Sequence, residues 1–148
     1  GSLLATSPER AKLLIWDLEA GEVLFTPSLA FTNLVSCMGF LPDYRLLASG
    51  HYDGSLRIWD APTGQLLLTI PGEGVITSIA FSPDGTVLAA ASTGDEPRLR
   101  LISTTTGELL RELTGHENAF DHLLFSPDGQ VLVSGSYDGT IKIWGIQP

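Results

Sequence analysis

Four copies of one short segment divide the chain into repeats, and this periodicity constrains the fold more than any other feature. The copies recur about every 43 residues and begin at Leu13 (LLIWD), Leu56 (LRIWD), Leu99 (LRLIS) and Ile141 (IKIWG). A second mark keeps the same order and spacing: FLPDY, FSPDG and FSPDG begin at Phe40, Phe81 and Phe125. A period of this length is typical of repeat architectures, in which each repeat buries its faces against its neighbours.

Within each repeat the apolar residues are spaced as in short strands. Runs such as VITSIAF and TVLAAAS are rich in β-branched residues or leucine and end at Gly, Pro, Asp or Ser. No segment keeps the spacing of an amphipathic helix. The Pro-Asp-Gly sequences after the Phe marks are tight turns, because proline presets φ and Asp and Gly tolerate the bend. We therefore predict an all-β fold with blades of four antiparallel strands, about 3.5 blades in this chain.

The best-formed repeat, Gly115 to Gly145, is GHENAFDHLLFSPDGQVLVSGSYDGTIKIWG, and it closely resembles the repeat of the WD40 β-propeller family. The resemblance covers the whole chain and implies a propeller whose inner strand a lines a central channel and whose outer strand d faces solvent. On that template residues 1–148 form one partial propeller. Its parts are strands b, c and d in 1–28, full blades in 31–71 and 72–114, and strands a, b and c in 115–148.

Fourteen strands are expected from the same template. They are Leu3–Ser7, Lys12–Trp16, Glu22–Phe25, Val35–Phe40, Arg45–Gly50, Ser55–Trp59, Gln65–Ile70, Ile76–Phe81, Val87–Ser92, Arg98–Ile102, Glu108–Leu113, Phe120–Phe125, Val131–Ser136 and Thr140–Trp144.

The chain resembles the C-terminal half of a seven-bladed ring, which is the commonest size in the family. The expected complement is strand d, three whole blades and strand a, from a partner polypeptide or from an N-terminal stretch of the same gene product. Gly1-Ser2 aligns with Gly85-Thr86 in the turn between strands a and b, although a cloning scar is the alternative for these two residues. Without the complement, unpaired strand edges and blade faces would be exposed.

The resemblance implies that His116, Ser134, Asp138 and Trp144 form one structural hydrogen-bonded set in the last blade. A buried indole N–H needs an acceptor, and an imidazole can link a hydroxyl to a carboxylate. A catalytic His–Ser–Asp reading is disfavoured, because Ser134 lies mid-strand beside the indole.

The other blades depart from this pattern. The second blade keeps Ser49, Asp53 and Trp59, which are expected to belong to its structural hydrogen-bonded set, with Phe31 at the histidine position. The third has Ala90 and Ile102 in place of Ser and Trp, and the first keeps Thr6 and Trp16 with Arg10 at the Asp position. These three blades are expected to depend on apolar packing.

Composition and motifs exclude several classes of function. The net charge is −9 with only eight Lys and Arg, which argues against nucleic-acid binding. No run of about 18 apolar residues exists, so no membrane span is expected. His116 and His122 lack further metal ligands at a suitable spacing, and neither a metal nor a cofactor is expected. The single cysteine, Cys37, has apolar flanks and is expected to be a buried inert thiol in a reducing, cytoplasmic or other intracellular compartment.

Candidate binding residues come from the resemblance, which implies partner contacts at the rim where strand a begins. The residues four before the Phe of strand a are Ser36, Thr77 and Asp121, and Leu34 lies two residues before the first of them. The residues before the turn Asp are Tyr52 and Tyr137, and exposed tyrosines are good anchors because they offer wide apolar area at low entropy cost.

The expected function is a non-catalytic WD40 interaction scaffold that binds a peptide or a partner loop on this rim. Two alternatives stay open: a propeller-based hydrolase or lyase, and a sensor or regulatory repeat region of a larger multidomain protein. Asp121 is the only charged residue among the candidate positions of strand a, which leaves little material for a catalytic cluster.

Overall fold

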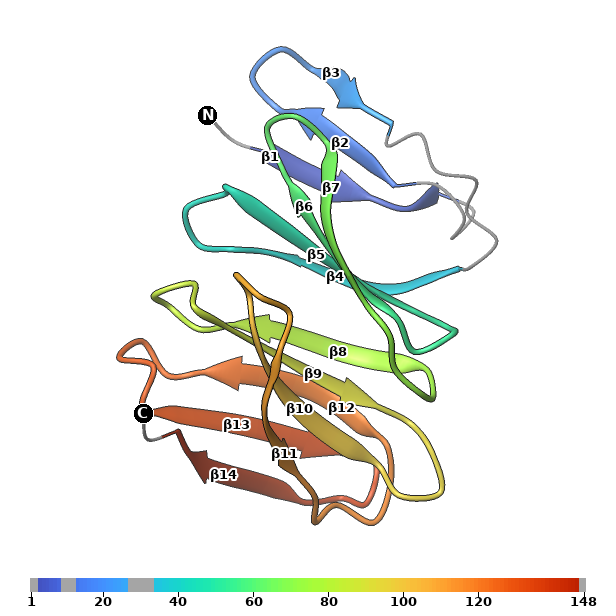
Figure 1. Cartoon of the computed structure of the whole chain (residues 1–148), viewed down its shortest axis with the longest axis vertical. Coiled ribbons are helices and arrows are strands. Elements are labelled where there is room, and N and C mark those ends of the chain that lie inside the picture. Colours follow the sequence, from blue (N-terminus) through green and yellow to red (C-terminus); the bar gives the residue numbers. More distant parts are fainter. Residues whose placement is uncertain (1–2, 9–12, 27–33, 147–148) are drawn as a thin grey trace.

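The computed structural model describes residues 3–8, 13–26 and 34–146, which form fourteen strands in four separate antiparallel sheets (Figure 1). Sheets 1 to 4 follow one another along the chain, and within each sheet neighbouring strands are also neighbours in sequence. The all-β, blade-like fold expected from the repeats is therefore confirmed. In the ranges that the structure describes, no helix is long and apolar enough to cross a membrane.

The two outer sheets have three strands each and the two inner sheets have four. Sheet 1 holds β1 (Leu3–Thr6), β2 (Leu14–Asp17) and β3 (Glu22–Phe25). Sheet 2 holds β4 (Val35–Phe40), β5 (Leu46–His51), β6 (Leu56–Asp60) and β7 (Gln65–Ile70). Sheet 3 holds β8 (Ile76–Phe81), β9 (Val87–Ser92), β10 (Arg98–Ser103) and β11 (Leu109–Leu113). Sheet 4 holds β12 (Phe120–Phe125), β13 (Val131–Ser136) and β14 (Ile141–Gly145).

Several strands begin one residue later than the sequence suggested, because a turn side chain takes the first amide. The Ser55 N–H donates to Asp53 Oδ1 at 3.0 Å, so β6 begins at Leu56. The Thr140 N–H donates to Asp138 Oδ1 at 2.8 Å in the same way, and β14 begins at Ile141. Short polar side chains thus compete with the strand ladder for backbone donors.

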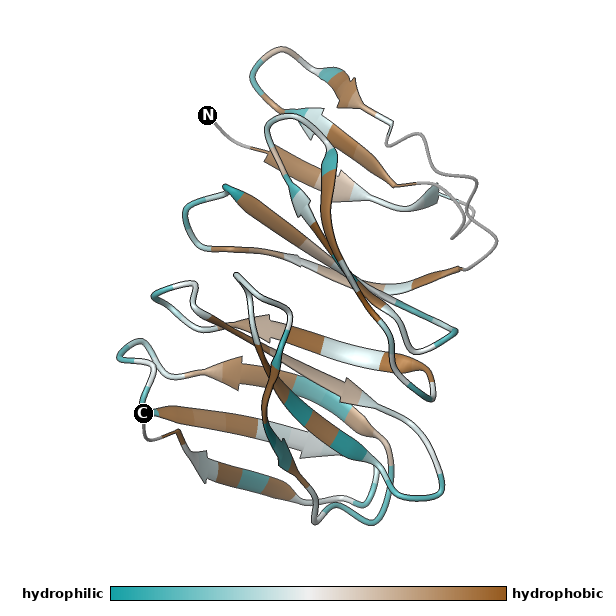
Figure 2. Cartoon of the chain, viewed as in Figure 1, coloured by the Kyte–Doolittle hydropathy of each residue, from teal (hydrophilic) through white to brown (hydrophobic). Residues whose placement is uncertain are grey.

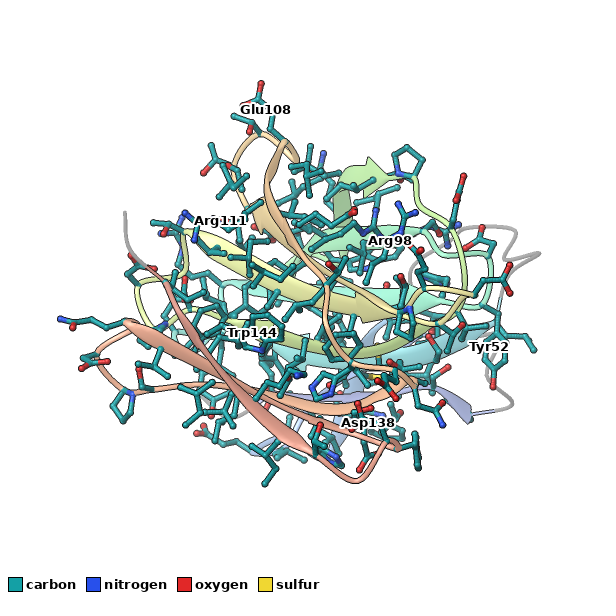
Figure 3. All side chains as sticks on the ribbon, turned by 90° about the horizontal axis from the view of Figure 1, so that it is seen from below. Tyr52, Arg98, Glu108, Arg111, Asp138 and Trp144 are labelled. Carbon is teal, nitrogen blue, oxygen red and sulfur yellow. The ribbon has the colours of Figure 1, made fainter. Side chains whose placement is uncertain are left out.

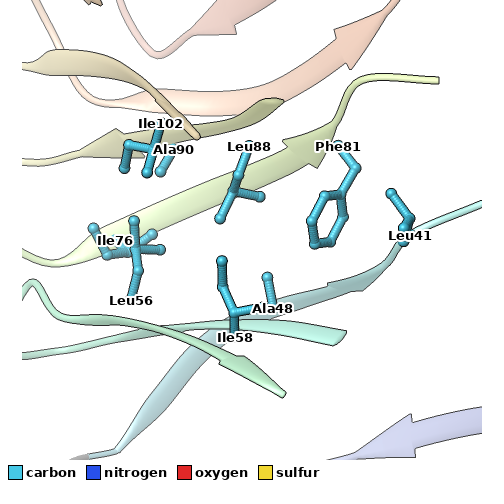
Figure 4. Close-up of a cluster of buried hydrophobic side chains, with 9 residues drawn as sticks. All are labelled: Leu41, Ala48, Leu56, Ile58, Ile76, Phe81, Leu88, Ala90 and Ile102. Atoms are coloured by element: carbon cyan, nitrogen blue, oxygen red, sulfur yellow. The ribbon is translucent and has the colours of Figure 1, made fainter. Parts of the chain in front are cut away.

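Consecutive sheets pack face to face through apolar residues at equivalent register positions. Ala48, Leu56 and Ile58 of sheet 2 cover one face of sheet 3, where they meet Ile76 and Leu88 (Figure 4). All five side chains are fully buried. At about 25 cal/mol per Å² of apolar surface, burying each of the larger ones contributes about 1.5–3 kcal/mol.

The next junction repeats the pattern one period later. Ala89, Leu99 and Leu101 on the other face of sheet 3 pack on sheet 4, against a cluster that includes Phe120 and Leu132. These residues align with Ala48, Leu56 and Ile58 in the repeat. The repeat in the sequence therefore places equivalent apolar residues at each junction between sheets.

We predict that a single methyl group at Gly50 disturbs the junction between sheets 2 and 3. An added Cβ would lie 2.5 Å from Ile76 Cγ2 and 2.7 Å from Cys37 Sγ. Gly50→Ala should lower the free energy of unfolding by about 1–3 kcal/mol, measured by denaturant titration. Gly135 is the matched control, because it aligns with Gly50 and its Cβ would meet nothing within 4 Å. Equal effects of the two substitutions would contradict this packing.

Candidate interaction site on the propeller rim

A β-bulge in each complete inner strand marks the rim. In sheet 2 Val35 pairs with His51 and Cys37 pairs with Gly50, so the intervening Ser36 has no partner in the ladder. The same shift leaves Thr77 as the extra residue of β8 and Asp121 as the extra residue of β12. Bulges redirect a side chain from its strand face. The three strand-a candidates chosen from the sequence are therefore the three bulged residues.

The turns after β5 and β13 bring two tyrosines to the same end of the sheets. The Tyr52 N–H donates to the Leu34 carbonyl and the Tyr137 N–H donates to the Ala119 carbonyl, both at 3.0 Å. Each tyrosine is thus held beside the start of its own strand a. The side chains remain exposed, at 42% for Tyr52 and 69% for Tyr137. Figure 3 shows Tyr52 at this end of the molecule, with Asp138 of the turn after β13 on the same side.

Five of the six binding candidates line one pocket of about 230 Å³, which we call the rim pocket. They are Ser36, Tyr52, Thr77, Asp121 and Tyr137, contributed by three successive sheets. Val75, Ile76 and Phe120 complete the lining. Leu34, the sixth candidate, is not part of the lining and contributes its backbone carbonyl to the position of Tyr52.

Asp121 is the charged group of the rim pocket. Its Oδ2 lies 2.9 Å from Nδ1 of the neighbouring His122, whose side chain is 85% exposed. The pocket therefore combines three aromatic side chains (Tyr52, Phe120 and Tyr137), the hydroxyl groups of a serine and a threonine, and one carboxylate. This mixture suits a peptide that offers an apolar side chain together with hydrogen-bond donors.

The polar set of sheet 4 is assembled as the resemblance implied. His116 Nδ1 lies 2.8 Å from Asp138 Oδ2, and His116 Nε2 lies 2.8 Å from Ser134 Oγ. The Trp144 indole N–H donates to the same Ser134 oxygen at 2.9 Å. Ser134 is fully buried and His116 is 5% exposed. The set joins the turn after β13 to strands β13 and β14.

Asp138 is also the cap of its turn. Its carboxylate accepts hydrogen bonds from the Thr140 hydroxyl and amide and from the Glu117 amide. The bond from the Thr140 hydroxyl is the largest cause that lowers the pKa of Asp138 far below its usual value, and the bond to His116 acts in the same direction. The carboxylate is therefore ionised at neutral pH.

Sheet 2 contains a polar set in which Ser49 and Trp59 were expected from the sequence and His51 was not. Trp59 donates its indole N–H to Ser49 Oγ at 3.0 Å, and that oxygen lies 2.9 Å from Nε2 of His51. His51 is fully buried and comes from the end of β5, where sheet 4 has Ser136. The expectation that this blade depends on apolar packing is therefore wrong, because an imidazole from another position reaches the serine.

Asp53 of sheet 2 caps its turn through the Ser55 amide and hydroxyl. Burial raises the pKa of Asp53, but the hydrogen bonds from Ser55 and the nearby His51 outweigh burial and lower it.

The position named for the histidine, Phe31, lies outside the described residues, as does Arg10 of the first blade. The sequence did show that His51 stands where the last repeat has Ser136, in HYDG compared with SYDG. The repeat pattern assigns no role to that position, so the difference predicted no hydrogen bond.

Sheets 1 and 3 differ from one another. In sheet 1 the Trp16 indole N–H donates to Thr6 Oγ1 at 2.8 Å, so the expectation that this blade depends on apolar packing is wrong as well. In sheet 3 the aligned residues, Ala90 and Ile102, are buried apolar side chains, as expected. A polar link between blades is present there as well, because the Arg100 guanidinium donates to the Pro71 carbonyl at 3.1 Å.

Cys37 is partly buried against sheet 3, where its Sγ lies 3.8 Å from the Ile76 carbonyl oxygen. Burial raises the pKa of its thiol to about 11, so the reactive thiolate is scarce at neutral pH. Within residues 3–8, 13–26 and 34–146, no three His, Cys, Asp or Glu side chains gather as a metal site would require.

Stacked four-stranded antiparallel blades with a rim of bulges and tight turns define a β-propeller protein. The model of the WD40 family (WD domain, G-beta repeat) matches residues 24–60, 64–100 and 107–145. The chain therefore belongs to the WD40 family, and the resemblance drawn from its repeats is confirmed.

Similar proteins extend over nearly all of the chain. Periodic tryptophan protein 2 of Arabidopsis thaliana is 32% identical over 146 residues, which are 97% of this chain and 16% of that protein. The small ribosomal subunit protein RACK1 of Schizosaccharomyces pombe is 35% identical over 139 residues, 88% of this chain and 43% of its own length. The chain thus spans less than half of these two relatives. The computationally designed Ika4 protein has a similar structure, with a TM-score of 0.85, 27% identity and coverage of 99% of this chain and 87% of Ika4.

We predict that the polar set of sheet 4 stabilises the fold. His116→Ala should lower the free energy of unfolding by about 1–3 kcal/mol, because buried Ser134 and the turn carboxylate lose a hydrogen-bond partner. His122→Ala is the control, since that side chain is largely exposed. Thermal or denaturant unfolding measures both variants. An unchanged melting midpoint for His116→Ala would show that the set does not stabilise the blade.

Proposed function

We propose that this chain is part of a non-catalytic WD40 interaction scaffold and that the rim pocket holds a peptide or a loop of a partner protein. The observation that supports this most is the convergence of five candidate residues from three sheets on one pocket. Exposed tyrosines at such a site supply apolar contact and hydrogen bonding at low conformational cost.

The arrangement around Ser134 favours binding over catalysis. A serine nucleophile needs access to substrate and a free path to an oxyanion site. Ser134 is fully buried and accepts the Trp144 N–H. We therefore rank a hydrolase or lyase below a scaffold, and a sensor region of a larger protein is a variant of the scaffold function.

We also propose an intracellular location. The single cysteine, which leaves no second thiol for a disulfide within these 148 residues, fits a reducing compartment. The relative named as a ribosomal subunit protein is consistent with this proposal.

A complementary propeller segment is the second partner that we propose. Ile141 and Ile143 of β14 are 74% and 73% exposed, and with Leu124 and Val133 they form an apolar surface that we call the open face. Figure 2 shows hydrophobic residues alternating with polar ones along β14. The aligned positions are buried in both inner sheets: Leu56, Ile58, Leu99 and Leu101.

The register explains which partner fits the open face. In sheets 2 and 3 these positions cover the next blade, and strand c pairs with a fourth strand, β7 or β11. We therefore propose that further WD40 blades cover the open face, either from a partner polypeptide or from the same gene product.

The rim proposal predicts that Tyr52→Ala with Tyr137→Ala weakens partner capture by about tenfold or more, because aromatic anchors dominate many interfaces. A pull-down with the intact propeller, followed by titration of the captured protein, measures this effect. Tyr44→Ala is the matched control, since Tyr44 is 46% exposed in the turn between β4 and β5, outside the rim pocket. If the double variant bound normally but melted earlier, the two tyrosines would be turn packing only.

The open-face proposal predicts that the isolated chain associates through this face, because an exposed apolar face with a free strand edge promotes association. Light scattering should show a mass that rises with protein concentration. Ile141→Lys with Ile143→Lys should reduce that rise, whereas Leu109→Lys with Leu110→Lys, at two exposed positions of β11, should not. A monomeric, cooperatively melting wild-type chain would contradict the proposal.

A further inference from the structure

A second pocket lies at the end of the sheets opposite the rim. Its volume is about 590 Å³, and it lies between the β8–β9 turn of sheet 3 and the β12–β13 turn of sheet 4. The two turns lie side by side at the left of Figure 1, away from the turns that carry the tyrosines. We call it the turn pocket. None of the binding candidates lines it.

The turn pocket has an apolar lining and an acidic edge. Pro83 and Val87 contribute from sheet 3, and Pro127 and Ile146 contribute from sheet 4. Asp84 and Asp128 stand in the same turns and belong to the lining. Both carboxylates are exposed.

The preceding junction shows what fills this space elsewhere in the same chain. Leu41 occupies the position of Ser82 one repeat earlier. Its side chain is 8% exposed and packs beside Phe81 and Leu88 in the junction between sheets 2 and 3 (Figure 4). A Cβ on Gly85 would lie 2.7 Å from Leu41 Cδ1, so the leucine fits closely against the next turn.

Ser82 leaves the corresponding space between sheets 3 and 4 unfilled. Its hydroxyl turns back to its own loop, where it donates to Asp84 Oδ1 at 2.6 Å and accepts the Val87 N–H at 2.9 Å. The aligned contact at Gly129 is made only by the edge of Pro83, 3.4 Å from an added Cβ. The junction between sheets 2 and 3 is thus filled by Leu41. The equivalent place between sheets 3 and 4 is a pocket.

The two carboxylates at the edge of the turn pocket determine which charge suits the neighbours of an apolar side chain that enters it. Asp84 Oδ1 accepts hydrogen bonds from the Ser82 hydroxyl and the Thr86 N–H. Asp128 Oδ1 accepts hydrogen bonds from the Ser126 hydroxyl and the Gln130 N–H. Hydrogen bonds from Ser82 and Thr86 lower the pKa of Asp84, and those from Ser126 and Gln130 lower the pKa of Asp128. Two negative charges therefore border an apolar pocket, and cationic side chains complement them.

From this geometry we propose that the turn pocket is a second docking site, which takes a protein segment carrying a leucine-like side chain next to lysine or arginine. The leucine takes the place that Leu41 has at the preceding junction, and the cation lies against Asp84 and Asp128. This site is independent of the rim pocket, because it lies at the other end of the sheets and shares no lining residue with it.

Saturation-transfer NMR on the full 148-residue chain tests the proposal with the peptide Gly-Lys-Leu-Lys-Gly as probe. We expect transfer to be strongest at the leucine methyl groups, and a peptide with serine in place of leucine should bind about tenfold more weakly. Ser82→Leu should abolish the transfer by filling the pocket as Leu41 does. Equal signals from the two peptides, or unchanged binding to Ser82→Leu, would overturn the proposal.

A second variant tests the charges without filling the pocket. Asp84→Asn with Asp128→Asn should weaken binding about threefold to tenfold at low salt and remove most of its salt dependence. Asp43→Asn is the matched control, because Asp43 holds the same turn position where Leu41 already fills the space. Unchanged affinity and salt dependence in the double variant would contradict the cationic part of the proposal. Ser82→Leu should leave capture at the rim pocket intact, so the two sites fail separately.

Discussion

The apolar contact between one blade and the next is the interaction on which the rest of the structure depends. A single antiparallel sheet of three or four short strands exposes two faces, and neither can be covered from within the blade. The repeat solves this by placing a small or branched apolar residue at the same register position in each period. Ala48, Leu56 and Ile58 do so in sheet 2, and Ala89, Leu99 and Leu101 do so in sheet 3. The turns and the polar sets are positioned only because these faces stack.

The strand pattern and the repeat spacing predicted nearly all of this fold. All fourteen strands were expected within two residues of their ends, because alternation, turn prolines and Asp-Gly pairs are local signals. The small differences have a local cause that pattern reading underestimates. At Ser55 and Thr140 an aspartate side chain competes for the first strand amide, and the ladder begins one residue later. The rim candidates were also predictable, although their bulged geometry was not, since a bulge depends on pairing with the neighbouring strand.

The hydrogen-bonded sets show where reading by aligned positions fails. In sheet 4 an imidazole before strand a reaches Ser134, whereas in sheet 2 an imidazole from the end of strand b reaches Ser49. The requirement is chemical: a buried serine that accepts an indole N–H is best satisfied by another polar partner. A histidine from either direction meets it. The family pattern names one of these positions, so His51 was missed, even though its burial and its neighbour follow from the fold once the sheet is built.

The residues that maintain the fold and the residues that differ between repeats occupy different positions in the blade. Positions that cover the next blade vary little, because a change there affects two sheets at once. Positions at the turns vary more: Leu41 becomes Ser82, and His51 becomes Ser136. Each of these exchanges leaves the strands in place and changes what the junction or the rim presents to a partner. Where Leu41 is replaced by Ser82, a pocket is found in place of the filled junction one repeat earlier. In a repeat protein of this kind, the informative residues for binding are therefore those at which one blade differs from its neighbours while the backbone stays the same.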